Sequence, residues 1–232
     1  MAREGCDLAG ERWLGGAPLV VLLHEGVSDR RGWRQVAGRL APQVTVVAYD
    51  RRGYGESPAS TASFTHVDDL LAVLDREQAG RAWLAGASAG GGLALDTALL
   101  APDRVAGLVL IGTAVSGAPE PELDPDTQRF DELLDAAIAA GDLAEVNRLE
   151  TWLWLDGPAQ PEGRVGGEPR ALALDMNAII LHNGDREDEG GSGVDAWHRL
   201  DEIEVPVMVA CGELDAPFLA DRCRELAGRL LP

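Results

Sequence analysis

The chain alternates between short, uninterrupted apolar runs and longer polar stretches. Five such runs lie at residues 19–24, 44–50, 82–85, 105–111 and 205–211. Apolar runs of this length are typical of parallel β-strands that are covered on both faces. A further short strand at the edge of a sheet is expected at residues 11–14.

Helical periodicity fills the gaps between the first four runs. Apolar residues spaced three and four positions apart predict helices at residues 33–40, from about residue 66, and at residues 91–100. Thr65 is a suitable N-cap for the second of these helices. The alternation of strand and helix predicts an α/β fold, with a mostly parallel sheet, helices on both faces and right-handed crossovers.

The pattern changes after the fourth strand, because no strand signal occurs between residues 116 and 200. Three helices are expected in this insertion, at residues 131–140, 142–155 and 169–181. In such an architecture an insertion of this kind forms a helical cap over the sheet. We therefore expect a first core segment, a cap and a returning core segment, at residues 1–115, 116–200 and 201–232.

Charge argues against one class of partner. The chain has 232 residues and a formal net charge of −19, and all 20 of its basic residues are arginine. A phosphate backbone would be repelled by so acidic a protein, so nucleic acid is not an expected partner. We interpret the acidity as a solvated surface.

The cysteines and the N-terminus indicate a cytoplasmic protein. Cys6, Cys211 and Cys223 are odd in number and have no metal-type spacing, which suits a reducing compartment and predicts neither a disulfide framework nor a metal site. No charged-then-apolar leader precedes the first strand, and no apolar run approaches the length of a membrane span.

The strongest candidate for chemistry follows the strand at residues 82–85. Residues 86–90 read Gly-Ala-Ser-Ala-Gly, between that strand and the helix at residues 91–100. A G-x-S-x-G sequence at a strand-to-helix turn is the pattern of a nucleophile elbow, in which flanking glycines relieve the crowding around a strained serine. A small-residue turn would explain the pentapeptide alone, but its setting favours Ser88 as a nucleophile.

Four segments together resemble the α/β-hydrolase superfamily, in its capped branch of small esterase, lactonase and haloperoxidase-like proteins. The likeness runs from about residue 13 to the C-terminus. In the order of the family, the segments are Leu22-Leu23-His24, the loop Tyr49-Asp50-Arg51-Arg52-Gly53-Tyr54-Gly55-Glu56-Ser57, the elbow Gly86-Ala87-Ser88-Ala89-Gly90, and the turn Gly212-Glu213-Leu214-Asp215.

The resemblance implies an oxyanion hole made of two backbone N–H groups, those of Ala89 and Gly26. The sequence departs from the family pattern in this loop, because Glu25 stands where the family usually has glycine. A carboxylate there would oppose the negative charge of the oxyanion unless it points away, and we expect that it points away. His24 in this loop is expected to have a structural, hydrogen-bonding role.

Asp215 is the implied acid of the catalytic triad, since the other usual position, at residues 112–114, carries no carboxylate. A helix cap before Pro217 is the alternative role for Asp215. The family places the catalytic histidine after a final strand that follows the acid, and no histidine follows Asp215 in this sequence. We do not expect a histidine of the cap to act as the base, although His182 stays a candidate.

The resemblance therefore implies a chain truncated before the final strand and the catalytic histidine. Two explanations stay open, a fragment of a longer hydrolase and a complete product. Without that final strand, the strand at residues 205–211 would lie at an open edge of the sheet, and such an edge invites pairing with a second copy as a homodimer.

Two functions from different classes remain. The first is a serine-type hydrolase that cleaves an ester, lactone or related acyl bond of a small apolar substrate, without a cofactor, with Trp152 and Trp154 as weak candidates for the substrate pocket. The second is a catalytically silent α/β-hydrolase-fold protein that binds a ligand or partner. The missing histidine supports the second function, and the elbow supports the first.

Overall fold

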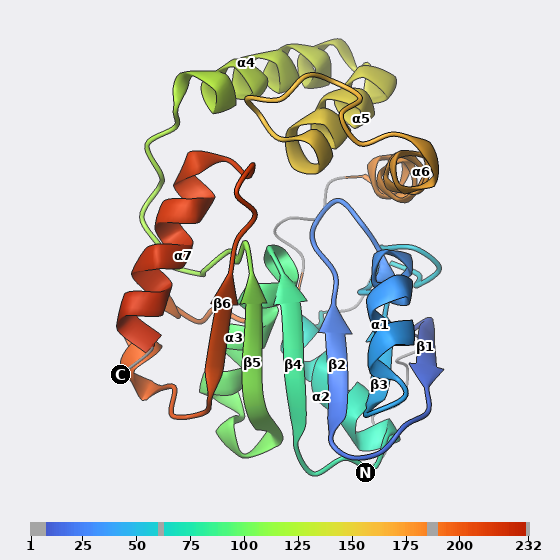
Figure 1. Ribbon diagram of the computed structural model, residues 1–232, viewed down its shortest axis with the longest axis vertical. Coiled ribbons are helices and arrows are strands. Elements are labelled where there is room, and N and C mark those ends of the chain that lie inside the picture. The colour runs from blue at the N-terminus through green and yellow to red at the C-terminus, as the bar shows by residue number, and fades with distance from the viewer. Residues whose placement is uncertain (1–7, 60–62, 185–189, 231–232) are drawn as a thin grey trace.

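Six strands form a single sheet in the computed structural model, which describes residues 8–59, 63–184 and 190–230. The strands are β1 Gly10–Trp13, β2 Leu19–Leu23, β3 Thr45–Tyr49, β4 Ala82–Ala87, β5 Val105–Ile111 and β6 Val207–Ala210. Their order across the sheet is β1-β3-β2-β4-β5-β6 (Figure 1). Strand β1 runs antiparallel to β3, and all other neighbours are parallel. The predicted mostly parallel sheet is confirmed.

The two faces of this sheet bury alternate side chains. Val21 and Leu84 belong to the larger core cluster, which includes residues of α2, α3 and α7. Leu22 and Ala85 face the opposite way and pack with Ala37 of α1. The helices are α1 Arg34–Leu40, α2 His66–Arg76, α3 Ala89–Leu100 and α7 Pro217–Leu230, with short 3₁₀ turns η1 Arg30–Trp33, η2 Pro102–Arg104 and η4 Trp197–Glu202. The predicted alternation of strand and helix is therefore observed, with helices on both faces.

A separate helical layer lies beyond the carboxyl ends of the parallel strands (Figure 1). It consists of α4 Pro125–Ala140, α5 Leu143–Thr151, the π-helical turn η3 Trp152–Asp156 and α6 Gly167–Asn183. This layer, the cap, has its own apolar core around Phe130, Leu149 and Leu153. Trp197 and Leu200, which follow the cap helices, already pack into the main core of the sheet.

Helix α4 begins six residues earlier than the sequence pattern predicts. The Asp124 carboxylate accepts hydrogen bonds from the N–H groups of Asp126 and Thr127, and Pro125 occupies the first helical position. Proline is favoured there because an N–H group at the first helical position would have no acceptor within the helix, so its absence costs no hydrogen bond. The expectation of a start at residue 131 is therefore wrong, since Pro125 starts the helix. No helix in the described part of the chain is long and apolar enough to cross a membrane.

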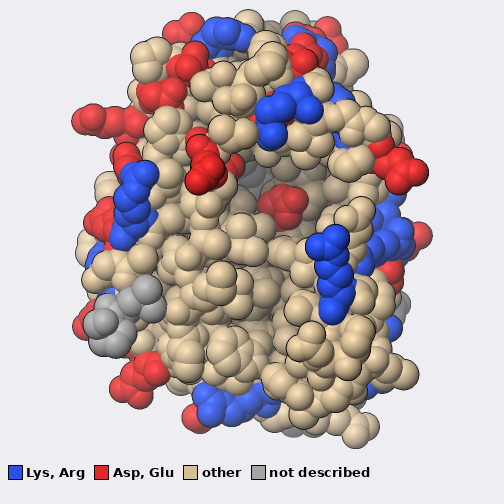
Figure 2. All heavy atoms as spheres, in the orientation of Figure 1, with Lys and Arg blue, Asp and Glu red and all other residues tan. Residues whose placement is uncertain are grey.

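Strand β6 lies at one edge of the sheet. It pairs with β5, and no other described strand pairs with it. Its neighbours on one face are apolar residues of the main core, whereas Met208 on the other face is 58% exposed. Figure 1 shows no helix in front of β5 and β6, and charged side chains are sparse over the same region in Figure 2. The predicted open edge is thus present among the described residues, and the homodimer stays a prediction.

Candidate active site

The turn between β4 and α3 holds Ser88 in a strained backbone conformation. Its φ of 48° and ψ of −117° lie in a region that residues with a side chain rarely adopt. Neighbouring backbone fixes the turn, because the Ser88 N–H donates to the Ile111 carbonyl at 2.9 Å and the Ala114 N–H donates to the Ser88 carbonyl at 3.2 Å. A strained residue that its surroundings hold so firmly is characteristic of functional sites.

Two glycines make this tight turn feasible. A Cβ atom at Gly86 would overlap the Gly90 carbonyl oxygen, and a Cβ atom at Gly90 would overlap the Leu23 carbonyl oxygen at the end of β2. Strand β4, helix α3 and strand β2 therefore approach one another at backbone distance. The close approach explains why the elbow pattern requires glycine two residues before and two residues after Ser88.

The two backbone N–H groups expected to form the oxyanion hole have no acceptor in the described part of the chain. Ala89 is the first residue of α3, so its N–H has no partner inside the helix. The N–H of Gly26, in the loop after β2, likewise donates to no described group. The positive end of the helix dipole adds to the first of these donors. Such N–H groups can stabilise an oxyanion if their directions converge.

Hydrogen bonds of His24 and Arg51 hold the loop that carries Gly26. The Nδ1 of His24 donates to the Glu25 carbonyl at 2.8 Å, and its Nε2 accepts the Arg51 N–H at 3.0 Å. The Arg51 guanidinium donates to the same Glu25 carbonyl at 3.0 Å. The Glu25 carboxylate forms no hydrogen bond or ion pair with any described residue, and its expected direction away from the oxyanion stays a prediction.

His24 has the structural role expected from the sequence. The ring is 1% exposed, and both of its nitrogens are engaged. Burial, together with the positive charge of Arg51, holds the pKa of His24 well below its usual value. His24 is therefore a neutral ring that shapes the loop, and it has no free nitrogen with which to accept a proton from Ser88.

The other three histidines lie at different places in the fold. His66 begins α2 and contacts the ring of Phe64, and His182 is in the last turn of α6. His198 hydrogen-bonds the exposed Asp195 carboxylate at 2.8 Å. Within the described residues, no hydrogen bond joins a histidine to Ser88 or to Asp215. A base for Ser88 is therefore not identified among the described histidines, and the truncated triad stays a prediction.

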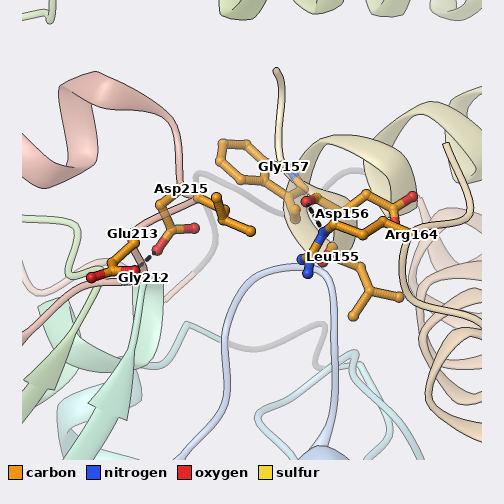
Figure 3. A pocket seen from close by; sticks show the side chains of 9 residues that line it. Leu155, Asp156, Gly157, Arg164, Gly212, Glu213 and Asp215 are labelled. Carbon is orange, nitrogen blue, oxygen red and sulfur yellow. Dashed lines mark hydrogen bonds between the residues drawn. The ribbon is translucent and has the colours of Figure 1, made fainter. Parts of the chain in front are cut away.

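Asp215 lies in the turn after β6. Like Ser88, it follows the carboxyl end of a parallel strand. Its Oδ2 accepts the Gly212 N–H at 2.9 Å and lies 3.5 Å from the Cys211 thiol, which donates to it. Burial and the nearby Cys223 and Asp215 raise the pKa of the Cys211 thiol to about 12, so the thiol keeps its proton. Figure 3 shows the second carboxylate oxygen directed toward the cap. Asp215 therefore presents one oxygen for a further hydrogen bond.

Ser88 and Asp215 are connected through the end of β5. Ser88 hydrogen-bonds Ile111, and the next residue, Gly112, donates its N–H to the Ala210 carbonyl of β6 at 2.9 Å. A Cβ atom at Gly112 would lie 3.9 Å from Oδ2 of Asp215. The sequence-predicted nucleophile and acid thus follow β4 and β6, the two strands that flank β5, at the carboxyl ends of the parallel strands.

A cavity of about 360 Å³ separates the Asp215 turn from the cap. It is lined by Trp154, Leu155, Asp156, Gly157, Arg164, Gly212, Glu213, Leu214 and Asp215 (Figure 3). Figure 2 shows this side of the molecule hollowed between the cap and the sheet. Gly157 narrows the cavity at one side, because its φ of 104° and its missing Cβ let the cap touch the Leu214 carbonyl. The cavity opens onto the acid of the predicted triad.

The two tryptophans predicted for a pocket have different environments. Trp154 is 40% exposed and lines the cavity. Trp152 instead packs edge-on against Phe130 in the cap core, with ring centroids 5.0 Å apart, and its indole N–H donates to the Gln160 carbonyl at 2.7 Å. Trp152 does not line the cavity. No motif in the sequence indicates that Cys211 or Gly157 contributes to this site.

No cluster of metal-ligating side chains is found among the described residues. The charged groups on the cap side of the cavity are occupied by structural bonds. Arg164 donates to the backbone carbonyls of Leu155 and Asp156, and the buried Asp156 carboxylate pairs with Arg170 at 2.7 Å. The cavity thus offers one available carboxylate oxygen, that of Asp215, whereas Ser88, Ala89 and Gly26 are not among its lining residues.

Comparisons with known proteins find relatives of similar sequence and structure. The sequence profile of the alpha/beta hydrolase fold family matches residues 18–152. A putative 2-succinyl-6-hydroxy-2,4-cyclohexadiene-1-carboxylate synthase of Bacillus subtilis is 29% identical over 206 residues, which cover 87% of this chain and 75% of that protein. Lipase LipV of Mycobacterium tuberculosis is 34% identical over 139 residues, 59% of this chain and 50% of the lipase. The crystal structure of an alpha/beta hydrolase from Sphaerobacter thermophilus superimposes with a TM-score of 0.68 at 27% identity, covering 97% of this chain and 85% of that one.

Proposed function

Because the chain belongs to the alpha/beta hydrolase fold family, we propose that it is a serine hydrolase that cleaves an ester, lactone or related acyl bond of a small, largely apolar molecule. The observation that carries the proposal is the conformation of Ser88, with a φ of 48° at the start of α3. A serine in so strained a position has no evident structural purpose, whereas a nucleophile must project from its turn.

In the proposed reaction, the Ser88 hydroxyl oxygen attacks the acyl carbon and the substrate carbonyl oxygen becomes an anion. The N–H groups of Ala89 and Gly26 donate hydrogen bonds to that anion. Loss of one such donor typically costs about 100-fold to 1,000-fold in kcat. Departure of the alcohol leaves the acyl group on Ser88, and water then releases the acid. The apolar wall of Trp154, Leu155 and Leu214 would bind the substrate beside Asp215.

Attack by Ser88 requires a base that removes the hydroxyl proton. Asp215 would orient that base through its available oxygen. The described histidines supply none at this position, which favours a second candidate function: a catalytically silent protein that uses the same cavity to bind a ligand. The name of LipV is consistent with the first candidate, although the match spans half the length of that lipase.

Labelling of the serine separates the two functions. An alkyl fluorophosphonate forms a stable adduct with an activated serine, and intact-mass measurement detects the adduct. We expect labelling and turnover of p-nitrophenyl acetate and butyrate in the wild type, and neither in Ser88→Ala. No adduct and no turnover in the wild type would show that the chain is silent. An adduct that persists in Ser88→Ala would overturn the assignment of Ser88.

A further inference from the structure

Helix α6 of the cap is attached to the core through Arg31. The Nη1 of Arg31, in η1, donates to Oδ2 of Asp175 in α6 at 2.7 Å. Beside this ion pair, the Met176 methyl group lies 3.9 Å from where a Cβ atom at Gly32 would be. In Figure 1, α6 lies directly above the loop that follows β2 and the start of α1.

The Arg31 guanidinium is fixed by a buried carboxylate before it reaches the cap. Asp29 is 0% exposed, and its two oxygens accept hydrogen bonds from Nε and Nη2 of Arg31, at 2.9 and 2.7 Å. The Arg31 N–H donates to the same carboxylate at 2.9 Å. A buried carboxylate needs such pairing, and the planar fork of arginine then has a fixed direction. Asp175 thus meets a donor whose position is set by the loop.

The segment that fixes Arg31 also carries the proposed oxyanion donor. Asp29 is three residues after Gly26, and the loop between them is tied to the core at both ends. At one end the Glu25 carbonyl accepts from His24, and at the other the Arg30 N–H donates to the Asp50 carboxylate at 2.8 Å. One arginine therefore joins the cap helix to the loop of the oxyanion hole.

We propose that Arg31 is a positioning residue that couples the placement of the cap to the geometry of the oxyanion loop, through its fork on Asp29 and its ion pair with Asp175. When α6 moves away, the loop loses the contacts of Asp175 and Met176 at the same time. When α6 is seated, both are present and Gly26 is held in place. The effect on catalysis rests on the proposed hydrolase function, but the coupling itself does not.

Hydrogen exchange of the whole chain tests the coupling without any need for activity. In Asp175→Asn, whose side chain is exposed, the fold is retained while the ion pair is lost. We expect amide exchange to rise by about twofold to fivefold, the range expected for an exposed ion pair, and by the same factor in α6 and at the amides of Arg30, Arg31 and Gly32. The control Asp221→Asn breaks the exposed pair with Arg224 in α7 and should change neither region.

High salt is a second test of the coupling. About 1 M NaCl screens exposed charges at short range, so it should raise the amide exchange rate of the wild type to that of Asp175→Asn. Faster exchange in α6 alone, or in neither region, would overturn the coupling.

Where p-nitrophenyl butyrate is turned over, Asp175→Asn should lower kcat as well as raise KM, whereas a residue that only anchors the cap would change KM alone. Arg31→Lys keeps the charge but loses the fork, so it should not restore kcat. A silent chain that shows coupled exchange would refute the hydrolase function and leave the coupling standing.

Discussion

The elbow at Ser88 and the turn at Asp215 both follow the carboxyl ends of parallel strands, but neighbouring residues hold them in different ways. The elbow follows a central strand, and its glycines Gly86 and Gly90 are buried among backbone atoms of β2, β4 and α3. The Asp215 turn follows the edge strand β6. Its carboxylate is fixed by one N–H and one thiol, and its neighbour Leu214 is 44% exposed.

This difference shows which half of the site the fold determines on its own. At the elbow, three elements approach at backbone distance, so any shift would create overlap or break buried hydrogen bonds. At the acid, the position of the side chain depends on weak bonds and on the proximity of the cap at Gly157. The nucleophile half is therefore rigid by construction, whereas the acid half depends on what packs against it.

The largest effect should come from adding a single methyl group to the elbow. In Gly86→Ala the new Cβ overlaps the Gly90 carbonyl, and a backbone shift in the core is expected to cost about 3 kcal/mol or more of the free energy of unfolding. Urea denaturation measures it. The control Gly38→Ala lies in α1 with open space around the new Cβ and should stabilise by about 0.5–1 kcal/mol. A loss of less than about 1 kcal/mol in Gly86→Ala would refute the claim of rigidity.

The second effect concerns His24 below the oxyanion loop. Its pKa is depressed in the folded protein by burial, while the unfolded chain takes up a proton near pH 6.5. The unfolded state thus binds more protons as the pH falls, so this contribution to stability is complete above about pH 6.5 and is lost below it, by up to about 1.4 kcal/mol per pH unit. His24→Asn should lack this slope between about pH 5 and 6.5 in pH-dependent urea titrations. An unchanged slope would show that His24 does not titrate in this way.

A smaller effect is expected at the acid. Asp215→Asn keeps the shape of the side chain and an oxygen that can accept the Gly212 N–H. We therefore expect a loss of about 1 kcal/mol at most in the free energy of unfolding, because the group is half-exposed. The control Asp221→Asn, at an exposed surface pair, should stay within about 0.5 kcal/mol of the wild type. A loss at Asp215 as large as that in Gly86→Ala would remove the distinction between the two halves.

The same distinction governs what the sequence could predict. Apolar runs and the G-x-S-x-G pattern are local signals, and they located β2 to β6 and the elbow, whereas the structural role of His24 followed from the resemblance to the α/β-hydrolase superfamily. The start of α4 differs from the prediction because the helix begins at the cap made by Asp124 and Pro125, ahead of the residues that show helical periodicity. The cap is also a local signal, because an Asp-Pro pair is typical of a helix start.

The remaining features depend on contacts between segments distant in the sequence. Trp152 and Trp154 are two positions apart, and only tertiary packing decides which one enters the cap core and which lines the cavity. The bond between Arg31 and Asp175 spans 144 positions. Neither residue belongs to a recognisable motif, so no pattern in the chain could have paired them.

The smallest effect on stability is expected at the outer edge of the acid half, where Met208 is 58% exposed on β6. Met208→Lys replaces a largely exposed side chain, so the free energy of unfolding should change by about 0.5 kcal/mol at most. Self-association should respond much more strongly, because a lysine on an open edge opposes strand pairing between copies. We expect analytical ultracentrifugation to show a concentration-dependent dimer in the wild type and a monomer in Met208→Lys. The control Leu100→Lys, at the exposed end of α3, should still dimerise. Equal masses for all three proteins would show that the edge of β6 does not pair two copies of the chain.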